Sequence, residues 1–155
     1  VRAEVSRNGG HSPRIWVACP ELGNYPAALA FLIEILPRTQ IDMTIYACKA
    51  LAQIGDKKAI PALLAKWKKH GQRGAPGTRY IPDALVACGA GPEVVPALVA
   101  PLKTMRFDFR FHVAHALGKV GGPKAVAALE DLAENDPFAA VRAEAKRGLR
   151  QLRTR

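Results

Sequence analysis

The sequence predicts an all-α fold, a right-handed α-solenoid of about four stacked helix pairs followed by a C-terminal helix. The chain repeats itself every 32 to 34 residues, apolar residues recur with helical spacing inside each repeat, and glycine ends most of the apolar runs. No segment alternates apolar and polar residues for long enough to predict a strand. Helix pairs of this length cannot bury their apolar faces alone, so we expect them to stack on their neighbours.

One apolar position fixes the register of the repeat. It is occupied in turn by Cys19, Leu51, Leu85, Leu117 and Leu149, at spacings of 32, 34, 32 and 32 residues. The predicted helix pairs cover residues 14–36, 42–70, 79–104 and 108–134, and the final helix covers 138–152.

The first two pairs begin and end at residues that suit helix termini. Pro26 lies in the first turn of the second helix of the first pair, where its missing N–H is not needed. In the second pair, Asp42 is a candidate N-cap and Gly55 a candidate left-handed C-terminal residue. The run that follows has apolar residues at i, i+3, i+4 and i+7, which predicts one buried stripe: Ile60, Leu63, Leu64 and Trp67.

The later elements follow the same pattern. The third pair has Gly89 at the end of its first helix and Pro92 at the start of its second. The fourth pair has Asp108 as a candidate N-cap and Gly121 as a stop. The last helix follows the candidate cap Asp136 and carries a second buried stripe, which consists of Val141, Ala145, Leu149 and Leu152.

Composition restricts the class of protein. The chain has 155 residues, a formal net charge of +10 and 49% hydrophobic residues, which fits one globular domain over residues 1–155. No apolar run approaches the roughly 20 residues of a membrane span, so we expect no membrane partner. Three widely spaced cysteines exclude a disulfide framework and favour a cytoplasmic setting. Residues 1–5 look like the start of a repeat helix, which suggests a piece of a longer protein.

Three segments carry a family resemblance. Residues 109–129 (FRFHVAHALGKVGGPKAVAAL) and 141–152 (VRAEAKRGLRQL) resemble the short bacterial HEAT-like repeats named after phycobilisome lyase subunits. Residues 45–64 match the family pattern from its first Ala onward but follow Thr44 where the family has Arg. The resemblance extends over about residues 14–152 and implies a scaffold in which the second helix of each pair lines the concave face. It also implies that Arg110 and Arg142 are structural, each pairing with an acidic group or a helix C-terminus.

The strongest charge feature lies between residues 57 and 79, a stretch without Asp or Glu. We predict a partner- or anion-binding site there, with Lys58, Lys66 and Lys69 pointing away from the buried stripe and, given the resemblance, onto the concave face. The alternative is an ordinary solvated face of a basic protein. The candidate site residues are Lys57, Lys58, Lys66, Lys68, Lys69, Arg73 and Arg79.

No catalytic or metal-binding set is predicted. His112 and His115 share a helix face, but neither is followed by the Glu that HEAT-like di-iron hydroxylases use, so we expect no metal and no cofactor. The cysteines fall at or beside core positions, which does not favour a nucleophile. The run of residues 106–111 mixes phenylalanine with charge, and two alternatives remain for it: a packed turn between repeats or an exposed stacking platform.

Three functions compete. The first is a non-catalytic binding or scaffold module whose concave helical surface holds a protein partner or another domain. The second is binding of nucleic acid or another polyanion through a basic groove. The third is a chaperone or enzyme subunit similar to the bilin lyases. The sequence favours the first, because the repeat is present and a catalytic set is not.

Overall fold

The structure, a computed structural model, describes residues 26–154, and this part of the chain contains α-helices, short 3₁₀ segments and no strand. The prediction of an all-α solenoid is confirmed for these residues. The first helix expected for the pair 14–36, including Cys19, lies outside the described residues. The helices are α3 (Pro26–Ile35), α4 (Ile41–Ile54), α5 (Ile60–Lys69), α6 (Ile81–Ala87), α7 (Val95–Val99), α8 (Phe107–Val120), α9 (Pro123–Asn135) and α10 (Ala139–Arg153).

The helix boundaries follow from glycine and proline. At the end of α4, Gly55 has φ of 67° and its N–H bonds to Leu51 O at 2.9 Å, a backbone conformation that glycine adopts without strain. Pro61 and Pro96 are the second residues of α5 and α7, where no intrahelical N–H bond is lost. Short 3₁₀ turns precede these helices, η2 (Lys57–Ala59) before α5 and η5 (Pro92–Val94) before α7.

The predicted N-caps are wrong at all three positions, because Asp136 is the residue after α9 and the N-cap of α10 is Phe138. Asp42 and Asp108 lie inside the first turns of α4 and α8, and the N-cap positions belong to Gln40 and Arg106. An acidic side chain in the first turn is still favourable, because it faces the positive end of the helix dipole. Asp136 follows α9 directly and accepts a hydrogen bond from Phe138 N at 2.9 Å, so it fixes the turn into α10.

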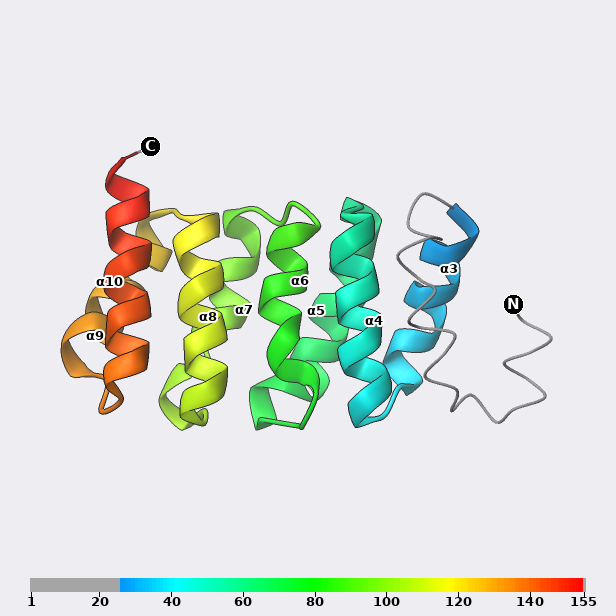
Figure 1. The fold of residues 1–155 in the computed structure, drawn as a ribbon, viewed down its shortest axis with the longest axis horizontal. Helices are drawn as coiled ribbons and strands as arrows, with labels where there is room; N and C mark the ends of the chain where they lie inside the picture. The colour runs from blue at the N-terminus through cyan, green and yellow to red at the C-terminus, as the bar shows by residue number, and fades with distance from the viewer. Residues whose placement is uncertain (1–25, 155) are drawn as a thin grey trace.

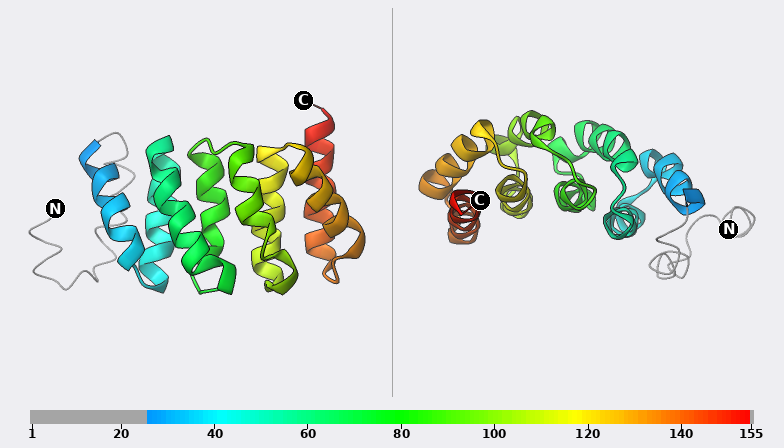
Figure 2. Two further views of the ribbon diagram at one scale, coloured as in Figure 1. Left: turned by 180° about the vertical axis from the view of Figure 1, so that it is seen from behind. Right: turned by 90° about the horizontal axis from the view of Figure 1, so that it is seen from above.

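The helices form two layers that curve together into an arc. Figure 1 shows α4, α6, α8 and α10 side by side in one layer. Seen from above in Figure 2, this layer lies on the inner side of the arc, and α3, α5, α7 and α9 lie on the outer side. The expectation that the second helix of each pair lines the concave face is therefore wrong: the first helices of the predicted pairs, together with α10, form it.

Side-chain size explains this curvature. The inner helices carry many small buried residues, and at Gly118 and Gly148 two of these helices approach closely. Gly118 of α8 faces Gly148 of α10, and a Cβ built on Gly118 would lie 2.6 Å from the Gly148 Cα. A layer with closer helices takes the shorter, inner path of an arc. The small residues on the inner helices include Ala47, Ala84, Ala114, Ala116, Gly118 and Gly148.

The core lies between the two layers and runs along the whole described part of the chain. Its leucines recur from repeat to repeat, as Leu51, Leu85 and Leu117 do on the inner layer, each with no exposed surface. Trp67 of α5 is also fully buried, and its indole Nε1 donates to Ala97 O of α7 at 2.9 Å. This hydrogen bond ties two outer helices together and satisfies the one polar atom of the ring.

Candidate functional site

The concave face is the surface that the inner helices turn to solvent. On α8 it consists of residues at helical spacing, Asp108, Phe111, His112, His115 and Lys119, which are half-buried or exposed. The opposite side of α8 is buried against the outer layer. Because α6 and α10 flank α8, the polar side chains on this face can bond across helices, and the described structure shows three such links.

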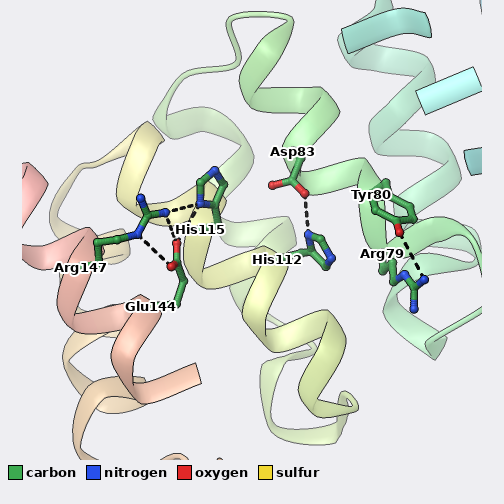
Figure 3. A network of polar contacts seen from close by, with 7 residues as sticks. All are labelled: Arg79, Tyr80, Asp83, His112, His115, Glu144 and Arg147. Atoms are coloured by element: carbon green, nitrogen blue, oxygen red, sulfur yellow. Dashed lines mark hydrogen bonds and ion pairs between the residues drawn. The ribbon is translucent and has the colours of Figure 1, made fainter. Parts of the chain in front are cut away.

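The first link joins α8 to α6. The Nδ1 atom of His112 lies 2.6 Å from Oδ2 of Asp83, and both side chains are partly accessible. The pair lies at the centre of the network in Figure 3. A carboxylate that orients an imidazole is common in active sites, but it equally fixes two helices in register.

The second link joins α8 to α10. The Oε1 atom of Glu144 lies 2.8 Å from Nδ1 of His115. Arg147 donates a hydrogen bond from its Nε to Oε2 of Glu144 at 2.9 Å. Burial of Glu144 opposes ionisation, but the hydrogen bonds from Arg147 and His115 outweigh it and hold the pKa of this carboxyl below its usual value. Glu144 is thus a fixed anion with both oxygens engaged (Figure 3), which suits a structural role rather than proton transfer.

The third link starts at Arg79, just before α6. Its Nη1 lies 3.4 Å from Oδ2 of Asp108 on α8, and its Nη2 donates to the Tyr80 hydroxyl at 3.3 Å. The hydrogen bond to Tyr80, followed by that to Asp108, raises the pKa of Arg79, which stays charged. This guanidinium also lies over the Tyr80 ring, 5.0 Å from its centroid.

Rings extend this polar surface. The edge of His112 meets the Tyr80 ring at 5.2 Å between centroids, and the Phe111 ring meets His112 at 5.8 Å. Lys49 of α4 reaches the same Tyr80 ring, with its Nζ 5.9 Å from the centroid. The concave face is therefore a mosaic of rings and paired charges that spans α4, α6, α8 and α10.

The predicted basic set does not gather on this face. Lys68 and Lys69 are exposed on α5, in the outer layer, and Lys57 and Lys58 are exposed in the turn η2 that precedes it. Arg73 is exposed in the 3₁₀ segment Gly71–Arg73 after α5. Of the seven predicted residues, Arg79 is the one that bonds within the concave network (Figure 3).

The prediction that Lys66 points outward is wrong. The residue is 6% exposed, and its Nζ donates to Thr39 O at 2.8 Å and reaches Pro37 O at 3.5 Å. Burial, followed by repulsion from Lys69, lowers the pKa of this ammonium, and the nearby Cys48 opposes that shift. The long methylene chain of lysine let this residue cross the packing surface and bind the backbone before α4.

The described thiols are not suited to catalysis. Burial is the main cause that raises the pKa of Cys48 to about 12 and that of Cys88 to about 11. Both side chains are buried, and Cys88 Sγ donates to Leu51 O at 3.4 Å. Within residues 26–154, no three His, Cys, Asp or Glu side chains come together as a metal site would need.

Sequence reasoning missed most of the concave network, namely Lys49, Tyr80, Asp83, Glu144 and Arg147. A usable signal was present, because all three links join residues 29 positions apart: Arg79 with Asp108, Asp83 with His112, and His115 with Glu144. A separation of 29 residues is shorter than the 32-residue spacing of the repeat by about one helical turn. Residues at this separation therefore lie opposite each other on neighbouring inner helices. Searching for opposite charges at that distance would have found them.

Two family models of repeat sequences match parts of the chain. The family model of HEAT repeats matches residues 83–150, and that of the PBS lyase HEAT-like repeat matches residues 45–66. No curated protein is similar enough to count as a match. Among the described helices, none has the length and apolar character needed to cross a membrane.

Proposed function

Because this chain is a HEAT-like repeat protein of the phycobilisome lyase-type class, we propose that it is a non-catalytic binding module. It presents the concave face of α4, α6, α8 and α10 to a protein partner or to another domain. HEAT repeats generally mediate protein interaction and scaffolding. The fold alone does not define the partner, so the argument rests on the chemistry of that face.

The observation that supports a protein partner is the compensation of charge on the concave face. Asp83, Asp108 and Glu144 each contact a cation or histidine of a neighbouring helix. Exposed and half-buried rings lie among these pairs, at Tyr80 and Phe111. Aromatic residues and arginine are enriched in protein interfaces, whereas a polyanion requires one dominant positive charge.

The polyanion alternative has weaker support. Its predicted groove loses Lys66, which is buried, and its remaining lysines lie on or beside the outer helix α5. The convex side of an arc spreads such charges apart instead of converging them on a ligand. The similarity to bilin lyases stays a prediction, since the part of the chain that the structure describes offers no specific support for it.

Affinity capture from an extract of the source cells tests the proposal. The wild-type chain is compared with K49E/A87E, which changes two exposed positions of the inner layer, and with K68E/A65E, which makes the same changes on the outer helix α5. Captured proteins are quantified by mass spectrometry. We expect the inner pair to lose the partner and the outer pair to retain it.

The two variants change charge equally, so the comparison separates position from net charge. Loss of the partner with K68E/A65E alone, or capture of nothing above the background of the bare matrix, would contradict the proposal. Binding to duplex DNA at low salt, lost on going to about 200 mM salt and sensitive to K68E/A65E, would instead support the polyanion alternative.

A further inference from the structure

Three exposed phenylalanines gather where α8 and α10 begin. Phe107, Phe111 and Phe138 are 44%, 37% and 46% exposed, and the fourth large apolar residue exposed in the described chain is Ile41 on α4. Phe107 and Phe111 are one turn apart on α8, and the Phe138 ring stacks on Phe107 at 4.7 Å with 20° between planes. We call these three residues the phenylalanine patch. Clustered exposed rings of this kind mark interaction sites.

Contacts within the protein hold Phe138, and through it the stacked Phe107, in place before any partner binds. The Arg110 guanidinium lies 5.6 Å from the centroid of the Phe138 ring and is itself fixed by Asp136, whose Oδ2 lies 2.6 Å from Arg110 Nε. Asp136 Oδ1 also accepts from Phe138 N at 2.9 Å. Little conformational entropy is lost when a partner covers rings that are already fixed, and this favours binding. Of the run of residues 106–111, Arg106 is the N-cap and residues 107–111 belong to α8, with Phe109 buried and Phe107 and Phe111 exposed.

The charge around the patch favours an acidic partner. Arg106, directly before Phe107, has 72% of its side chain exposed. Two carboxylates close in sequence to the patch are already engaged, Asp108 by Arg79 and Arg106, and Asp136 by Arg110. The first turn of α10 contains no acidic residue. The whole chain carries a formal charge of +10, which repels a second copy and attracts acidic segments.

We propose that the phenylalanine patch is the docking site for an acidic peptide segment of the partner. An apolar side chain of the peptide packs on Phe107, Phe111 and Phe138, and its carboxylates pair with the terminal nitrogens of Arg106, whose Nε lies 3.3 Å from Asp108 Oδ1. This inference rests on the proposed function and adds the chemistry of the partner. The Phe111 ring continues through its contact with His112 to the Tyr80 ring, so a bound segment can extend from the patch onto the concave face.

Nucleic acid and a second copy are the competing occupants. A single strand would stack its bases on the same rings, but it also needs cations that follow its phosphates. The exposed lysines of the predicted basic set lie instead on α5 and the turn before it, in the outer layer. These alternatives become outcomes of the test.

Selection from a displayed library of random 16-residue peptides tests the inference on the full chain. We expect the enriched peptides to combine Asp or Glu with an aromatic or large aliphatic residue. Their affinity is then measured by fluorescence anisotropy. F107A/F138A should weaken binding at least tenfold, about the effect of losing a central aromatic anchor. R106E should also weaken it and make it less sensitive to salt.

Matched variants control for non-specific effects. I41A removes the other large apolar residue that is exposed within residues 26–154, and K68E reverses an exposed charge on the outer helix, so both should leave the affinity unchanged. Thermal unfolding checks that each variant is folded. Enrichment of neutral or basic peptides, no enrichment, or equal binding by F107A/F138A would overturn the inference. So would preferential binding of a 12-nucleotide thymidine strand, or dimerisation through the patch.

Failure of this inference is distinct from failure of the proposed function. A cellular partner that is lost with K49E/A87E but retained with F107A/F138A leaves the concave face as the binding surface and removes the phenylalanine patch from it. Loss of the partner with both variants supports the two proposals together.

Discussion

Arg110 of α8 and Asp136, the residue after α9, form a two-point ion pair in the C-terminal part of the solenoid. Arg110 Nε lies 2.6 Å from Asp136 Oδ2, and Nη2 lies 3.2 Å from Oδ1, with 2% of the Asp136 side chain exposed. Arg142 of α10 donates from Nη1 to Asp136 O at 2.7 Å. The two arginines of the repeat pattern thus converge on one turn, which agrees with the structural role expected for them.

Removing one partner of this pair is expected to destabilise the fold strongly. Arg110→Ala leaves the buried Asp136 carboxylate without its main partner, at a cost of about 3 kcal/mol in the free energy of unfolding. Urea unfolding measures this loss. Arg106→Ala is the control, because Arg106 is 72% exposed and its ion pair with Asp108 contributes less than about 1 kcal/mol. Equal losses in the two variants would contradict the structural role of Arg110.

Acid is expected to weaken the fold through Glu144 and Asp136. Burial opposes ionisation of both carboxyl groups, but their hydrogen-bond partners outweigh it. Arg147 and His115 hold the pKa of Glu144 below its usual 4.5 in the folded state. Arg110 holds the pKa of Asp136 below its usual 3.8. The unfolded chain therefore takes up these protons first. The stabilisation is complete above the unfolded values and is lost as pH falls through the folded ones.

Glu144→Gln isolates the share of this effect that belongs to Glu144. The variant loses a charged hydrogen-bond acceptor, so the free energy of unfolding falls by about 2 kcal/mol at pH 7. The difference in the free energy of unfolding between wild type and variant should narrow as the pH falls below 4.5 and through the lowered folded-state pKa of Glu144, because the wild-type carboxylate then becomes protonated and loses its charge. Urea unfolding at a series of pH values provides the measurement. A gap that stays constant or widens in acid would contradict the assignment.

Helix periodicity and turn residues were sufficient to predict the solenoid. The leucine series and the glycine stops are local features, and the structure repeats them helix by helix. The layer that faces inward was not predictable in the same way, because curvature depends on how closely helices approach, for instance at Gly118 and Gly148, which are distant in sequence. Lys66 shows a second limit: helical spacing gives the direction of a Cβ, whereas a long side chain can turn back to a buried carbonyl.

A methyl group between α8 and α10 is expected to disturb the inner layer. Gly118→Ala adds a Cβ 2.6 Å from the Gly148 Cα, which forces the helices apart at a cost of about 1–3 kcal/mol, more than the gain of about 1 kcal/mol in helix propensity. Gly148→Ala places its Cβ 3.1 Å from the Gly118 Cα, so the loss should be smaller. Thermal unfolding ranks the variants. Stabilisation by Gly118→Ala would show that the close approach of the two helices is not required.

Lys66 separates a structural lysine from a ligand-binding one. Lys66→Met keeps the length of the side chain but removes the donor to Thr39 O, so we expect the free energy of unfolding to fall by about 2 kcal/mol. Burial, the first cause, lowers the pKa of Lys66 below its usual 10.5. Lys68→Met, on the exposed side of α5, should change stability by less than about 0.5 kcal/mol.

Any weak binding of duplex DNA at low salt should be reduced by Lys68→Met and remain unaffected by Lys66→Met. A Lys66→Met variant of full stability with weakened DNA binding would instead mean that Lys66 points outward, as its position in the sequence predicts.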